Sequence, residues 1–159
     1  METTLRWAIH QLHPLPRYVS GHVALLGDAA HAMTPHQGAG AGQSIEVSLL
    51  ASKTEYNTFK SHSFKDAYIL AGILSHRSVT LENLPEALKA YEHVRLPFVN
   101  DIVERSRNAG ALYELRSVHG DNYTTLGQAI DNQWPWVESE DPAAQLERAL
   151  DWMMNHGRM

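Results

Sequence analysis

The chain has 159 residues, the usual size of one domain, so it has room for one hydrophobic core and not for several independent domains. Hydrophobic residues make up 43 % and charged residues 19 %, a composition that excludes a largely disordered chain. The net charge is −5 with scattered basic residues, which argues against a nucleic acid partner, and the lack of cysteine excludes disulfides, thiolate metal sites and cysteine nucleophiles.

The N-terminal stretch does not have the form of a signal peptide, because Met1 to Trp7 contains an acidic residue and no long apolar run. No later segment approaches the roughly 20 apolar residues that a bilayer-crossing helix needs. We therefore expect a soluble, cytoplasmic protein without a membrane span.

The first predicted element is a buried strand over 22–26. This run is apolar and partly β-branched, and it ends abruptly at Gly27 and Asp28. From Ala29 to Gly42 the residues are small or turn-forming, with Pro35 before a run of alternating glycine and alanine. Such a stretch brings backbone, rather than side chains, close to a ligand.

Helix signals dominate the rest of the chain. A helix is expected over 66–76, with its apolar positions at helical spacing: Ala67, Leu70, Ala71 and Leu74. Asn83 and Glu86 form a capping-box-like start to a long helix that Pro97 should kink. The predicted core stripe of that helix is Leu88, Tyr91, Phe98, Ile102, Ala109 and Leu112. A last helix is predicted from Asp141 to near Gly157.

The strongest chemical signal is the Gly27-Asp28 pair together with the glycine run that follows it. A carboxylate at the end of a strand can accept hydrogen bonds from sugar or polyol hydroxyls, and free backbone N–H groups at a helix start suit an anionic or carbonyl-rich ligand. The same residues could instead form a flexible connection in which Asp28 serves only as a turn or cap residue, and spacing alone leaves both interpretations open. His31 and His36 are five apart, on different faces of a helix, so no metal pair is expected.

The stretch 27–46, GDAAHAMTPHQGAGAGQSIE, resembles the second FAD-binding motif of the flavin-dependent aromatic hydroxylases, the group A monooxygenases of the salicylate and 4-hydroxybenzoate hydroxylase type. The likeness extends to Trp7, 14–17, 66–71 and a pattern on the long helix that includes Tyr91, Arg95 and Pro97. It covers most of the chain and weakens after about Leu115.

The resemblance implies a mainly α chain with one or two residual strands, the C-terminal part of an α/β FAD-binding fold of the 4-hydroxybenzoate hydroxylase type. It implies that Asp28 holds a ribityl hydroxyl of FAD, that Gly27 allows close approach, and that Pro35 lies beside the isoalloxazine ring. The remaining cofactor-binding residues that it implies are Gly38, Gly40, Ala41 and Gly42. The parent reaction would be hydroxylation of a salicylate-like small aromatic substrate with NAD(P)H and O2. Because the cofactor supplies the chemistry, no catalytic side chain is assigned.

Two departures from the family pattern bear on function. The Rossmann unit for the ADP half of FAD, with its G-x-G-x-x-G motif, is not in this sequence, so we treat 1–159 as one partial FAD-binding domain. In addition, residues 47–65 interrupt an otherwise family-like helix, and removing them joins Glu46 to Asp66. We interpret this nineteen-residue stretch as a non-family insert, either an in-frame translated intron or a genuine surface loop. The isolated chain is expected to bind FAD weakly or not at all.

Two other functions remain open at this stage. The chain could be a non-catalytic helical remnant or interaction module from an incomplete gene model. It could also keep the flavoprotein fold with another task, such as epoxidation or oxidation without oxygen insertion, because a fold does not determine a substrate.

Overall fold

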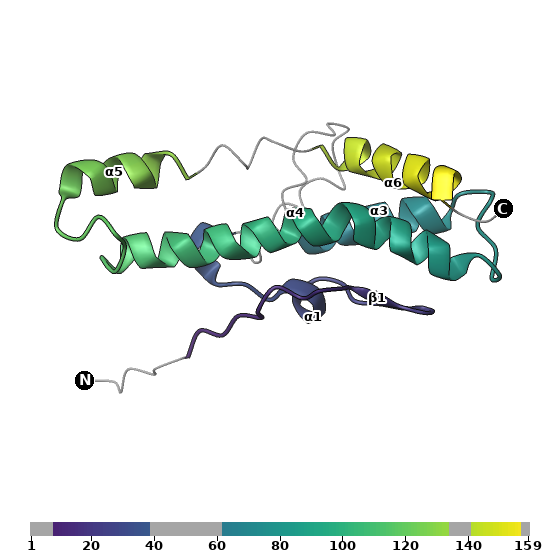
Figure 1. Cartoon of the computed structure of the whole chain (residues 1–159), viewed down its shortest axis with the longest axis horizontal. Coiled ribbons are helices and arrows are strands. Elements are labelled where there is room, and N and C mark those ends of the chain that lie inside the picture. Colours follow the sequence, from purple (N-terminus) through teal and green to yellow (C-terminus); the bar gives the residue numbers. More distant parts are fainter. Residues whose placement is uncertain (1–7, 39–61, 134–140, 157–159) are drawn as a thin grey trace, which may run out of the picture.

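The computed structural model of the protein describes residues 8–38, 62–133 and 141–156. Two short strands and several helices follow one another along the chain (Figure 1). They are β1 (Val19–Ser20), β2 (Val23–Ala24), α1 (Asp28–His31), the 3₁₀ helix η1 (Pro35–Gln37), α3 (His62–Leu74), α4 (Leu84–Tyr113), α5 (Tyr123–Asp131) and α6 (Pro142–His156). The predicted fold class, mainly α with one or two strands, is confirmed. None of the described helices combines the length and apolar character that crossing a bilayer requires.

The 30-residue helix α4 is the element on which the others pack. Helices α3 and α6 lie along its N-terminal half, and the β1–β2 hairpin and α1 lie on its other side (Figure 1). The buried core lies where these elements meet, and apolar burial there is the main source of stability. Its buried members are Tyr18, Val19, Ala30, Ile69, Ile73, Ala87, Leu88, Ala90, Tyr91, Val94, Ala149 and Met153.

The predicted buried strand over 22–26 is wrong in its extent and its burial. Only Val23–Ala24 is strand, and it pairs antiparallel with β1, with Val19 opposite Ala24 and Ser20 opposite Val23. Within the described residues β2 has no second neighbour, so the side chain of Val23 is 63 % exposed. An apolar run is ambiguous in this respect, because it does not reveal how many strands will flank it.

The predicted helix over 66–76 exists as α3, but the predicted apolar face is wrong. Ala67, Ala71 and Leu74 are exposed, whereas Asp66, Ile69 and Ile73 are fully buried. The i, i+3, i+7 spacing of the buried set is helical, but its first member is a carboxylate that pattern reading assigns to the surface. The side of α3 that faces α4 therefore includes the charged side chain of Asp66, which can be buried only because other groups pair with it.

The long helix α4 begins and continues largely as predicted. Of its predicted core stripe, Leu88, Tyr91, Ile102 and Ala109 are buried, and the other two members are half-buried. The helix runs through Pro97 without ending.

The predicted capping box at the start of α4 is wrong. The side chain of Asn83 makes no cap hydrogen bond, since its Oδ1 accepts from Thr80 N at 2.7 Å and its Nδ2 donates to Ser78 O at 2.8 Å. Asn83 therefore closes the preceding turn instead of capping the helix.

The two C-terminal helices differ in how well the sequence predicted them. Helix α6 runs over Pro142–His156, as expected from Asp141 and Pro142, and the Asp141 carboxylate accepts from Ala143 N at 3.0 Å. Helix α5 was not predicted, although Asn122 caps it by accepting from Thr125 N at 3.2 Å.

The proposed insert over 47–65 lies mostly outside the described residues. Its last four residues belong to α3, which begins at His62, and the Lys65 side chain is buried. Its status as a translated intron or a loop stays a prediction.

Candidate functional site

The Gly27–Asp28 turn connects the hairpin to α1. Gly27 is buried and has φ 54° and ψ −136°, a backbone conformation that is essentially restricted to glycine. Its carbonyl accepts from the N–H groups of Ala30 and His31 at 2.9 Å each, which forms the first turn of α1. Asp28 follows with an exposed side chain, so its carboxylate is open to a ligand.

A buried carboxylate, that of Asp66 on α3, lies directly behind this turn. Its Oδ2 accepts from Gly27 N at 2.9 Å and contacts His31 Nε2 at 2.7 Å. Its Oδ1 accepts from Arg95 Nε on α4 at 2.7 Å. Arg95 in turn donates through Nη1 to Gln145 Oε1 on α6 at 2.7 Å. We call these four side chains, Asp66, His31, Arg95 and Gln145, the buried polar cluster.

The buried polar cluster favours the ionised form of Asp66. Burial by itself raises the pKa of this carboxyl group. The hydrogen bond from His31, the charge of Arg95 and the N–H of Gly27 act in the opposite direction and outweigh burial. The pKa of Asp66 is therefore lowered, and the ion pair with Arg95 persists throughout the physiological pH range.

Two tyrosines and a glutamate attach the hairpin to α4. The Tyr91 hydroxyl donates to Leu25 O at 3.1 Å, and Glu92 accepts the backbone N–H groups of Tyr18 and Val19. Burial, with the nearby charge of Asp66, raises the pKa of Tyr18 to about 12 and also raises the pKa of Tyr91. Both phenols therefore stay protonated at neutral pH.

The Pro35–Gly38 turn packs on the C-terminal half of α4. Ser106 Oγ donates to Thr34 O at 2.5 Å, which fixes the start of η1. The His36 ring lies against Gly110 of α4. Because glycine has no side chain, the helix surface leaves room for the ring at this position. Pro35 and Gly38 are both exposed, and Gly38 ends η1 in the left-handed conformation with φ 63°.

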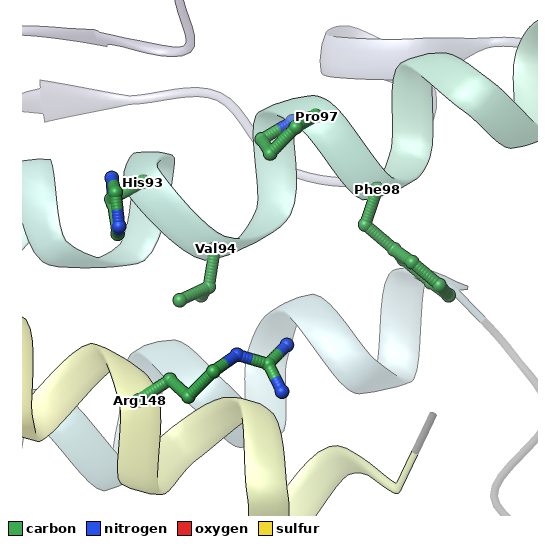
Figure 2. A pocket seen from close by; sticks show the side chains of 5 residues that line it. All are labelled: His93, Val94, Pro97, Phe98 and Arg148. Atoms are coloured by element: carbon green, nitrogen blue, oxygen red, sulfur yellow. The ribbon is translucent and has the colours of Figure 1, made fainter. Parts of the chain in front are cut away.

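A hollow of about 360 Å³ lies between α4 and α6, lined by His93, Val94, Pro97, Phe98 and Arg148 (Figure 2). Beside it, Trp152 stacks between the rings of His93 and His156, with centroids 5.3 and 4.8 Å away. Helix α6 and the hairpin lie on different sides of α4 (Figure 1), so this hollow is separate from the Gly27–Asp28 turn.

Among the residues that the structure describes, no group of three or more His, Asp or Glu side chains could hold a metal ion. His31 is 3 % exposed, and its Nε2 contacts Asp66 Oδ2 at 2.7 Å.

Comparisons with known proteins agree with the sequence motif. No protein-family model matches the chain. A salicylate hydroxylase from Pseudomonas putida is 40 % identical over 155 residues, covering 95 % of this chain and 31 % of the relative. The FAD-dependent monooxygenase str9 from Strobilurus tenacellus is 34 % identical over 154 residues, covering 94 % and 32 %. A solved salicylate hydroxylase substrate complex is similar with a TM-score of 0.73 and 35 % identity, covering 90 % of this chain and 30 % of that one.

Over most of its length the chain is homologous to salicylate hydroxylase and other FAD-dependent monooxygenases. It spans about a third of the length of the relatives that it matches. The resemblance noted for residues 27–46 and the long helix thus extends over nearly the whole chain.

The structure describes only some of the residues that are predicted to contact the flavin. Gly27 and Asp28 form one turn, while Pro35 and Gly38 belong to the next, and both turns pack against α4. The other three predicted residues, Gly40, Ala41 and Gly42, lie outside the described residues.

Sequence reasoning missed the buried polar cluster behind these turns. Asp66 and Arg95 were noted only as parts of the family pattern, and their pairing was not foreseen. The sequence does contain a signal for this cluster. Arg95 is four residues after Tyr91, so it lies on the same helix face as the predicted buried stripe, where a charged residue needs a partner.

Proposed function

We propose that this chain forms the flavin-facing C-terminal part of a FAD-dependent monooxygenase that hydroxylates a small, salicylate-like aromatic substrate with NAD(P)H and O2. This homology supports the cofactor and the reaction class. The observation that carries the proposal is the geometry of the Gly27–Asp28 turn. The glycine-only backbone of Gly27 and its hydrogen bond to the buried carboxylate of Asp66 leave the side chain of Asp28 exposed.

The described residues fit the polyol part of FAD. A carboxylate is an acceptor-only group, so an exposed Asp28 pairs well with a ribityl hydroxyl donor. The exposed Pro35 and Gly38 provide a rigid, uncharged surface suited to a planar ring. We infer from the family resemblance that Gly40, Ala41 and Gly42, which lie outside the described residues, also contact the flavin.

Within such a site the chain's own residues bind, orient and exclude water, while FAD supplies electron transfer from NAD(P)H and the activation of O2. Asp28 would fix the rotation of the cofactor about its ribityl chain. Pro35, at the first position of η1, would limit the space beside the ring where the aromatic substrate lies. No side chain of this chain is assigned a proton-transfer role.

A chimera tests the proposal directly. The matched part of the Pseudomonas putida salicylate hydroxylase is replaced by this chain, once with residues 47–65 and once without them. We expect the version without 47–65 to retain FAD after desalting and to oxidise NAD(P)H in response to salicylate. Asp28→Ala in that version should weaken FAD binding about 10- to 100-fold, the value of a hydrogen bond to a charged group.

Glu147→Ala is the matched control, because Glu147 is an exposed carboxylate on α6 and its loss should leave FAD binding unchanged. A chimera that is folded by circular dichroism but retains no FAD in either version would contradict the proposal. That result would favour the non-catalytic helical remnant.

A further inference from the structure

The carboxylate of Asp66 holds both ends of α1 at one oxygen atom. Oδ2 lies 2.9 Å from Gly27 N, just before the helix, and 2.7 Å from Nε2 of His31, its last residue. Between these two attachment points, Gly27 and His31, the side chains of Asp28 and Ala29 face outward and are exposed. The same contact that buries one side of α1 therefore turns the Asp28 side away from the core.

Three helices hold this carboxylate in place. Asp66 comes from α3, Arg95 from α4 and Gln145 from α6, and all three side chains are 0 % exposed. Arg95 joins the other two, with 2.7 Å contacts to Asp66 Oδ1 and Gln145 Oε1. A charge-assisted contact shielded from water is stronger and better oriented than the same contact at a surface.

Helix α1 cannot hold itself in position. It has four residues, far fewer than an isolated helix needs to be stable. Gly27 adds a sparsely populated backbone conformation that persists only where surrounding structure imposes it. Its N–H is buried, and the acceptor that satisfies it is Asp66 Oδ2.

We propose that Asp66 is a positioning residue for the flavin site: its Oδ2 fixes the Gly27–Asp28 turn toward the FAD ribityl chain, while Arg95 and Gln145 fix Asp66. This rests on the proposed function for the identity of the ligand. Asp66 does not itself touch the cofactor, because it lies on the buried side of α1.

The substitution Asp66→Asn separates charge from shape. An asparagine has one acceptor oxygen and one NH2 group, while the site presents N–H donors at both carboxylate oxygens. Whichever way the amide points, its NH2 meets either the Gly27 N–H or the Arg95 Nε–H. The substitution also removes the negative charge that Asp66 places beside the buried guanidinium of Arg95.

His31→Phe provides a second variant that keeps the Asp66–Arg95 ion pair. It removes one of the two attachments of α1 and retains a ring of similar size beside Tyr18, whose own ring is 6.1 Å away. It therefore loosens the turn without leaving a buried charge unpaired. Asp101→Asn is the matched control, because Asp101 forms an exposed ion pair with Arg105 on α4.

The experiment uses the full ¹⁵N-labelled chain with two NMR readouts. The first is hydrogen exchange of the Gly27 amide, which reports its bond to Asp66 without any ligand. The second is the change in the Asp28 amide signal when FAD is added to millimolar concentration, which detects weak binding.

We expect His31→Phe and Asp66→Asn to speed Gly27 exchange at least tenfold relative to the amides in the middle of α4, and to reduce the FAD-induced change at Asp28. Asp101→Asn should do neither.

If Asp66→Asn does not fold, His31→Phe alone decides the outcome. Gly27 exchange equal to that of the wild type in a folded variant would overturn the positioning role. Absence of any FAD-induced change in the wild-type chain, with faster Gly27 exchange in the variants, would leave the control of the turn by Asp66 supported, since the exchange readout needs no ligand, and the chimera would then decide the proposed function.

Discussion

The contact between Gly110 and His36 makes a steric prediction that can be worked out from the structure. Gly110 lies inside α4, and a Cβ built on it would be 2.6 Å from both Cε1 and Nδ1 of the His36 ring. Ordinary contacts between such atoms are about 3.5–4.0 Å, so the methyl group of Gly110→Ala overlaps the ring by about 1 Å. His36 belongs to η1, so the ring yields either by rotating about its side-chain bonds or by moving the turn that carries Pro35.

Two opposing terms set the size of the effect. Replacing glycine by alanine inside a helix stabilises it by about 1 kcal/mol. Overpacking a well-filled contact costs about 1–3 kcal/mol. Gly127→Ala in α5 is the matched control, because a Cβ at Gly127 meets nothing within 4 Å. The helix-propensity term is common to both substitutions, so the difference between them isolates the steric cost.

Urea unfolding of the two variants measures this difference. We expect Gly127→Ala to be more stable than the wild type and Gly110→Ala to be about 1–3 kcal/mol less stable than Gly127→Ala. His36→Ala should remove the clash, so it should cost less in the Gly110→Ala background than in the wild type. Equal stabilisation by both glycine substitutions would refute the packing of His36 on α4.

Three further predictions concern stability. Gly27→Ala should destabilise the chain by about 1–3 kcal/mol in urea unfolding, because its backbone conformation is essentially glycine-only; a neutral effect would contradict that conformation. Asn122→Ala removes the cap on Thr125 N and should cost about 1 kcal/mol, seen as faster amide exchange in α5 but not in α6. Asp66 binds fewer protons in the folded chain because its pKa is lowered, so its contribution is present above the usual carboxyl pKa of 3.8 and is lost as the pH falls below it. Unfolding free energies measured between pH 7 and pH 2.5 should therefore fall more steeply for the wild type than for Asp66→Asn, and parallel curves would contradict this.

The sequence predicted the elements whose signals are local. Helix α6 follows from Asp141, Pro142 and an apolar repeat, and the buried stripe of α4 follows from helical spacing. The short α5 was missed because nine residues hold too few apolar repeats for periodicity to register, although Asn122 was an available cap signal.

The failures share a physical cause, which is that a distant partner determines the local outcome. Helical spacing predicts the wrong core face for α3, because Asp66 has the character of a surface residue and its partner Arg95 lies 29 positions later in the chain. Asn83 was expected to cap α4, but Ser78 and Thr80 offered its side chain better partners in the preceding turn. The sequence predicts a change of structure at Gly27, but the preceding strand ends at Ala24 and Asp28 already belongs to α1, and the side chains behind this turn come from separate helices.

The central position of α4 has a consequence for how the molecule opens. The hairpin, η1, α3, α5 and α6 each contact α4, so local opening of any one of them can leave the others in place, while opening of α4 removes support from all. Amides in the middle of α4 should therefore exchange only through global unfolding, and α5, which is short and has Leu126 as its one buried residue, should exchange through fraying at little cost. The Gly27–Asp28 turn, whose neighbours β1 and α1 contact α4, can therefore open locally while α4 stays folded.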